Sequence, residues 1–118
     1  VALFGIGSLF ARLPSRVYSG GFLDPDEIAH AQEDGVVGDV CTVLLREDGS
    51  TDMDLNKRAS GPSPATLRKI PRRLAVVAGA SKALPLLGAL HAGVITDLVL
   101  DDGAARELLD LVHHRAHA

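Results

Sequence analysis

The feature that most constrains the fold is a strand, helix and strand pattern between Arg73 and Leu100. Leu74 to Ala78 is an unbroken apolar run, which is typical of a buried strand. A helix is expected over about Ala83 to Ala92, and Asp97 to Leu100 reads as the next strand. Strands joined in this way lie parallel, with a right-handed crossover. The pattern therefore predicts an α/β fold with a Rossmann-like parallel sheet.

The segments before this unit predict further elements. Val1 to Ile6 is an apolar run expected to be a buried strand. Asp24-Pro25-Asp26-Glu27 has the composition of a capping box, so a helix is expected from Pro25 to Asp34. Val40 to Leu45 predicts a strand, and Glu47-Asp48-Gly49-Ser50 predicts the turn of a hairpin that returns toward Met53 and Leu55.

Smaller signals complete the expected organisation. Gly38-Asp39 precedes a predicted strand and reads as a structural turn, and Cys41 is expected inside the strand as a small core residue. A short helix should start at Ser63-Pro64 and stop before Pro71. A last helix should start near Gly103. We expect residues 1–112 to form part of one domain and residues 113–118 to be a frayed tail.

Charge and cysteine content narrow the classes of function. The formal net charge of −3 provides no field for binding nucleic acid, and the few aromatic residues (3%) predict an aliphatic core. The single Cys41 favours a reducing compartment, hence the cytoplasm. No apolar run reaches the roughly 18 to 20 residues of a membrane span. His30 and His91 have no partner at metal-ligand spacing, so neither a metal nor a cofactor is expected.

Three polar clusters follow predicted strands, where ligands of parallel α/β sheets collect. Gly79-Ala80-Ser81-Lys82 could bind an anion through backbone amides and the lysine, although a tight turn with a solvated lysine has the same sequence. Asp101 and Asp102 could accept bonds from sugar hydroxyls or cap the last helix. Asn56 and Arg58 suit polyol and phosphate oxygens, and equally a solvated loop.

Five short blocks, in order, resemble the sugar-binding domain of SorC/DeoR-type bacterial transcription regulators. They are Phe4–Ser8, Gly35–Val40, Leu55–Arg58, Ile70–Ala83 and Asp97–Asp101. The resemblance implies part of a domain of the sugar isomerase and CoA-transferase superfold that binds a phosphorylated sugar effector. It also implies assembly as a dimer or tetramer, and DNA contact only through a helix-turn-helix upstream of this chain.

Residue by residue, the resemblance matches Gly79 and Lys82 to the family's ligand loop, Asn56 and Arg58 to its polar loop, and Asp101 to its acidic strand end. Ala80 stands where the family commonly has a second glycine. No catalytic residue is assigned. The alternatives are a sugar-phosphate isomerase or deaminase of the same superfold, with Asp101 as its one candidate base, and a domain that serves only in dimerisation.

Overall fold

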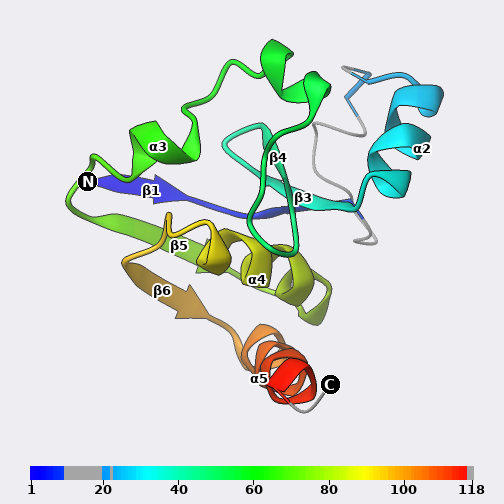
Figure 1. Ribbon diagram of the computed structural model, residues 1–118. Coiled ribbons are helices and arrows are strands. Elements are labelled where there is room, and N and C mark those ends of the chain that lie inside the picture. Colours follow the sequence, from blue (N-terminus) through cyan, green and yellow to red (C-terminus); the bar gives the residue numbers. More distant parts are fainter. Residues whose placement is uncertain (10–19, 22, 117–118) are drawn as a thin grey trace.

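A computed structural model describes residues 1–9, 20–21 and 23–116 and contains two three-stranded sheets (Figure 1). The first sheet consists of β1 (Ala2–Phe4), β5 (Arg73–Val77) and β6 (Asp97–Leu100), in the order β1-β5-β6. Both pairings are parallel, and the register aligns Leu3 with Leu74 and Val76 with Val99. The parallel sheet predicted from the strand, helix and strand pattern is therefore confirmed.

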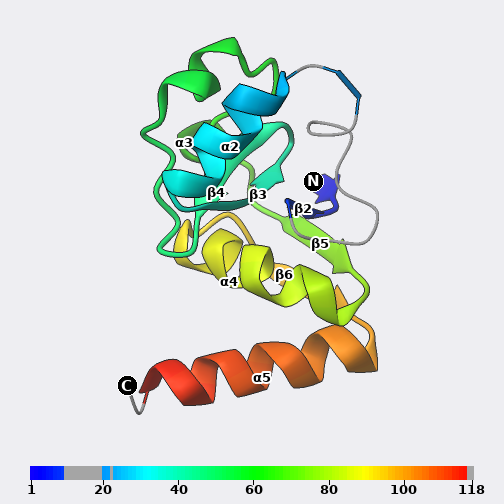
Figure 2. The same cartoon turned by 90° about the vertical axis from the view of Figure 1, so that its right-hand side faces the viewer.

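The connection from β5 to β6 runs through a short 3-10 turn, η2 (Ala80–Lys82), and the helix α4 (Ala83–His91). Helix α5 (Asp102–Ala116) follows β6 and lies beside α4 (Figure 2). The fully buried Leu86 and Ala89 of α4 share one core with Ala75 and Val77 of β5. The predicted crossover helix thus covers one face of the parallel sheet.

The other face of this sheet is open. Side chains alternate between the faces of a strand, and Leu3, Val76 and Val99 share the face opposite the core. These three residues are 70%, 49% and 52% exposed. The predicted burial of the first strand therefore holds for only one of its faces.

The second sheet corrects the predicted strand at Val40 to Leu45. It is antiparallel and joins β2 (Gly7–Ser8), β3 (Val36–Val40) and β4 (Val43–Arg46) in that order. Cys41 and Thr42 form the turn between β3 and β4, with φ angles of 50° and 73°. A two-residue hairpin turn of this type requires such left-handed conformations, usually supplied by Asn or Gly, and neither residue type stands at these positions. Cys41 lies in this turn and not inside a strand.

Two neighbouring predictions were also wrong. Gly38-Asp39 lies within β3 and is not a turn, and the segment after Met53 forms a 3-10 helix, η1 (Asp54–Arg58), in place of a returning strand. Of the predicted hairpin after β4, the turn at residues 47–49 is present and the returning strand is not.

A second small core lies between the β3–β4 hairpin and helix α2, with Ala31, Val36 and Leu44 buried in it.

The predicted helix starts are confirmed by their caps. Helix α2 (Pro25–Glu33) has the full capping box, with Asp24 and Glu27 each accepting from the other's backbone N–H. Helix α3 (Pro64–Leu67) is capped by Ser63. Helix α5 continues to Ala116, beyond the start of the expected frayed tail, and residues 117–118 lie outside the described part, as does the loop around Pro14. None of the described helices has the length and apolar character needed to cross a membrane.

Gly38 of β3 lies where β2 and helix α4 both pass very close to the strand. A β-carbon at this position would lie 2.1 Å from the Gly7 carbonyl oxygen and 2.5 Å from Cβ of Pro85. A β-carbon on Gly88, one turn beyond Pro85 in α4, would likewise lie 2.5 Å from the Arg46 carbonyl oxygen. The absence of side chains at these glycines lets α4 pack directly on the hairpin.

We expect Gly38→Ala to destabilise the protein by about 1 to 3 kcal/mol, because the added methyl group overlaps backbone that cannot move freely. Gly5→Ala is the matched control, since the nearest atom to its added β-carbon is 3.9 Å away. Urea denaturation measures both free energies of unfolding. Equal stability of the two variants would contradict the close packing of α4 on β3.

Candidate functional site

The carboxyl ends of β1, β5 and β6 meet at one edge of the parallel sheet, and two hydrogen bonds connect them. The Gly79 amide, just after β5, donates to the Asp101 carboxylate after β6, at 3.1 Å from each oxygen. On the other side, Lys82 Nζ donates to the Ile6 carbonyl oxygen after β1, at 2.7 Å. The glycine turn, its lysine and the acidic strand end therefore share one edge, as the sequence predicted.

Asp101 has a clear structural role at this edge. Its carboxylate accepts from the Ala104 amide at 2.9 Å, which caps the start of α5, as well as from Gly79. These bonds hold the pKa of the Asp101 carboxyl below its ordinary value, and the bond from Ala104 has the larger effect. The carboxyl is therefore ionised at neutral pH. Of the two roles predicted for the Asp101 and Asp102 cluster, Asp101 performs the capping of the last helix. Asp102 instead pairs with Arg106 on the surface.

Lys82 lies on an open cleft of about 360 Å³, within the size range of small-molecule sites. The lining residues come from the bend after β1, from the β3–β4 hairpin and from η2: Phe4, Gly5, Ile6, Gly7, Asp39, Cys41, Thr42 and Lys82. Helix α4 begins directly after Lys82 without a side-chain cap, so the positive end of its dipole lies at the same edge. The cleft combines a cation, backbone groups and a carboxylate.

The carboxylate is that of Asp39, at a position where the sequence predicts a structural turn and no ligand contact. It lies in β3, is only 6% exposed and lines the cleft together with Lys82. A signal was available in the sequence, since an acidic residue between apolar neighbours of a buried strand is costly unless it has a function or partners. Burial, and to a smaller extent the negative charge of Asp39, raises the pKa of the Cys41 thiol. This cysteine therefore stays neutral.

Asn56 and Arg58 lie apart from this cleft. The Asn56 side chain accepts from the Leu44 amide at 2.7 Å and donates to the carbonyl oxygens of Leu44 and Thr51, each at 2.8 Å. Arg58 forms an ion pair with Glu27 of α2 at 2.6 Å. Both side chains hold η1 against its neighbours, and neither lines the cleft beside Lys82. Their assignment to a ligand remains a prediction.

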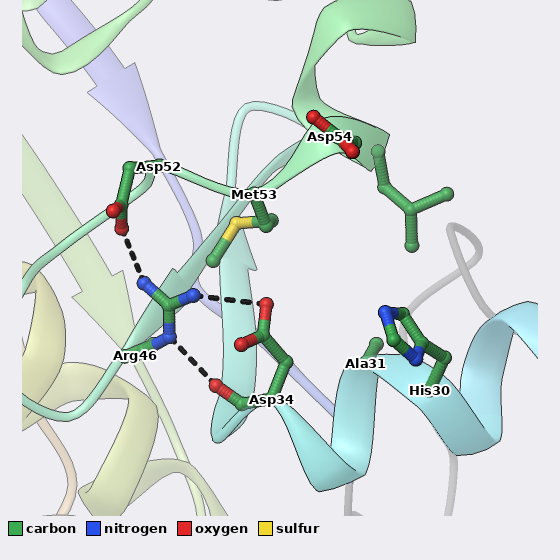
Figure 3. A pocket seen from close by; sticks show the side chains of 8 residues that line it. His30, Ala31, Asp34, Arg46, Asp52, Met53 and Asp54 are labelled. Carbon is green, nitrogen blue, oxygen red and sulfur yellow. Dashed lines mark hydrogen bonds and ion pairs between the residues drawn. The ribbon is translucent and has the colours of Figure 1, made fainter.

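A second cleft lies between α2 and η1 (Figure 3). Its cation, Arg46, forms ion pairs with Asp34 and Asp52 and donates to the Asp34 carbonyl oxygen (Figure 3). His30 and Asp54 lie on the opposite side of the cleft. Because the guanidinium is occupied by its own carboxylates, this cleft offers an incoming anion little positive charge. In the described part of the chain no cluster of three or more His, Cys, Asp or Glu residues could hold a metal ion.

Comparison with known proteins decides the family. A family model described as "Putative sugar-binding domain" matches residues 1–110. The chain belongs to this family. The resemblance drawn from the five sequence blocks is thereby confirmed, and so is the partial-domain fold.

Relatives of this sugar-binding domain are regulators of transcription. It is 32% identical over 109 residues to the transcriptional regulator YjhU of Escherichia coli K12, covering 92% of this chain and 33% of YjhU. Among solved structures, a domain of a "possible sugar-binding transcriptional regulator" from Arthrobacter aurescens is 48% identical, with a TM-score of 0.81 and coverage of 92% and 41%. The sorbitol operon regulator SorC of Klebsiella pneumoniae is 28% identical, with a TM-score of 0.77 and coverage of 92% and 35%. The chain thus spans about a third of the full-length regulators.

We expect Asp101→Ala to lower the melting temperature of the sugar-binding domain at pH 7. The folded-state pKa is depressed, so the carboxylate stabilises the fold above its unfolded pKa of roughly 3.9, and this contribution disappears as the pH falls through the lower folded value. The difference between wild type and variant should therefore shrink from pH 5 to pH 2. Asp102→Ala, which removes the neighbouring surface carboxylate, should have little effect. A pH-independent difference would show that Asp101 acts through packing alone.

Proposed function

We propose that this domain binds a phosphorylated sugar effector at the cleft beside Lys82 and is the effector-sensing part of a bacterial transcription regulator. The observation that carries the proposal is the meeting of Lys82 and the buried Asp39 carboxylate on one cleft at the carboxyl edge of the sheet. Membership of the sugar-binding domain family and the regulators among its relatives support it.

Each group at this edge of the sheet has a role that follows from its chemistry. The Lys82 ammonium and the positive end of α4 attract the phosphate, and the η2 turn, with Gly79, Ala80 and Ser81, carries Lys82 to the cleft. The Asp39 carboxylate accepts hydrogen bonds from sugar hydroxyls. Asp101 holds the Gly79 amide in place and can still accept a hydroxyl through the remaining lone pairs of its carboxylate.

We further propose that binding occurs without turnover. An isomerase or deaminase needs a general base within reach of its substrate, and the candidate base, Asp101, accepts two backbone amides at the start of a helix. The relatives are regulators, which also favours sensing over catalysis. Incubation of the protein with ribose 5-phosphate and glucosamine 6-phosphate tests this point, and a chemical product would support the enzyme alternative.

Regulation then requires two states of the whole protein. The sugar phosphate must bind one arrangement of a dimer or tetramer more tightly than another, and this difference in affinity changes the binding of DNA by residues outside this chain. Such a regulator acts at the bacterial chromosome, hence in the cytoplasm. A domain used only for dimerisation would show no stabilisation by any sugar phosphate.

A thermal-shift screen of the protein against phosphorylated and free sugars, with inorganic phosphate as a control, identifies the ligand class. Lys82→Ala should then weaken binding of the phosphorylated sugar about tenfold or more, because a hydrogen bond to a charged group contributes roughly 1.5 to 3 kcal/mol. Binding of the free sugar should change little. The control is Lys57→Ala, whose ammonium is exposed and pairs with Asp54. Equal losses for both ligands would count against a phosphate contact.

Asp39→Asn should weaken the phosphorylated and the free sugar by a similar factor, because the carboxylate is assigned to hydroxyl groups that both ligands carry. We expect a loss of about tenfold in isothermal titration. Asp48→Asn serves as a control on the exposed turn after β4, where the carboxylate accepts from the Ser50 amide. Unchanged affinity in Asp39→Asn, with the fold intact, would remove Asp39 from the site.

A further inference from the structure

The segment after β1, from Ile6 in the bend to Ser8 of β2, contacts the η2 turn through two hydrogen bonds between residues far apart in sequence. Ser8 Oγ donates to the Ser81 carbonyl oxygen at 3.2 Å, and Lys82 Nζ donates to the Ile6 carbonyl oxygen at 2.7 Å. Ser8 is completely buried, and it is one of only two polar or charged residues buried in the described part of the chain. A hydroxyl buried away from water destabilises the fold unless it forms hydrogen bonds, so this bond contributes to the arrangement of the backbone.

The η2 turn depends on such external contacts for its position. Gly79, at its start, has a φ of 97°, which glycine reaches because it has no β-carbon and which leaves its backbone less restricted than that of other residues. Helix α4 has no side-chain cap that would fix its first turn. The Asp101 carboxylate holds the turn at the Gly79 amide, on the β6 side. Ser8 of β2 holds it at the Ser81 carbonyl, on the opposite side. The turn is therefore anchored from both sheets.

The second anchor lies immediately before Lys82. An ammonium group has three donors, and the Ile6 carbonyl takes one of them. The other two donors remain available at the cleft that Lys82 and Asp39 both line. A shift of the Ser81 carbonyl would move the Lys82 backbone with it and would break the alignment with Ile6.

We propose that Ser8 is a positioning residue of the effector site, which holds the η2 turn so that the Lys82 ammonium faces the cleft. Ser8 itself need not touch the ligand, since its hydroxyl acts through the Ser81 carbonyl. This inference rests on the proposed function for its consequence in binding, whereas the anchoring of the turn is a property of the free protein.

The test combines hydrogen exchange with ligand titration of Ser8→Ala. Loss of one hydrogen bond should speed exchange of the Lys82 and Ala83 amides about fivefold and weaken the phosphorylated sugar found in the screen, or ribose 5-phosphate, by a similar factor. The matched control is Ser63→Ala, which removes the cap of α3 and lowers stability without touching η2. It should leave both readouts unchanged.

Should Ser8→Ala not fold, Ser8→Cys keeps the shape of the site with a weaker donor and should change both readouts in the same direction.

The two readouts separate this inference from the proposed function. Unchanged exchange of the η2 amides in the Ser8 variant would overturn the anchoring, even if sugar phosphates bind to the wild type. Faster exchange with unchanged affinity would overturn the positioning role and leave the effector site standing. If the wild type binds no sugar phosphate, the proposed function fails, and the exchange measurement still decides whether Ser8 anchors the turn.

Discussion

Parallel pairing of β5 with both β1 and β6 is the constraint on which the rest of the structure depends. Parallel strands end at the same edge, so one central strand delivers the Gly79 turn between the ends of its two neighbours. The Asp101 carboxylate and the Ile6 carbonyl then hold this turn from opposite sides. The helices α4 and α5 start from the same edge, which places the positive ends of their dipoles there.

Close packing of α4 on the antiparallel hairpin completes the site. Gly38 and Gly88 leave no side chain between the helix and the strands, and the hairpin is thereby held beside the edge of the parallel sheet. This contact brings Asp39 of β3 into the cleft with Lys82, although they are far apart in the sequence. The cleft therefore belongs to both sheets, and its shape depends on the packing that joins them.

Local signals explain which elements could be predicted. The capping box at Asp24 and Glu27 and the Ser63-Pro64 start satisfy helix N-termini with groups only a few residues away, so the sequence alone reveals them. The hairpin turn at Cys41 and Thr42 could not be found in this way, because both residues adopt left-handed conformations that their side chains disfavour. The surrounding packing, including the close approach of Gly61 to the Cys41 carbonyl, holds them there.

The sequence by itself determined the α/β class, the strand, helix and strand unit, the family and the edge on which Lys82 and Asp101 lie. These follow from apolar runs, glycine turns and motif order, all of which are local or ordered along the chain. Only the tertiary structure decided that Asp39 joins Lys82, that Asp101 caps α5, and that Asn56 and Arg58 serve β4 and α2. These outcomes depend on contacts between distant segments, and the type and spacing of residues along a chain do not specify which polar groups such contacts will satisfy.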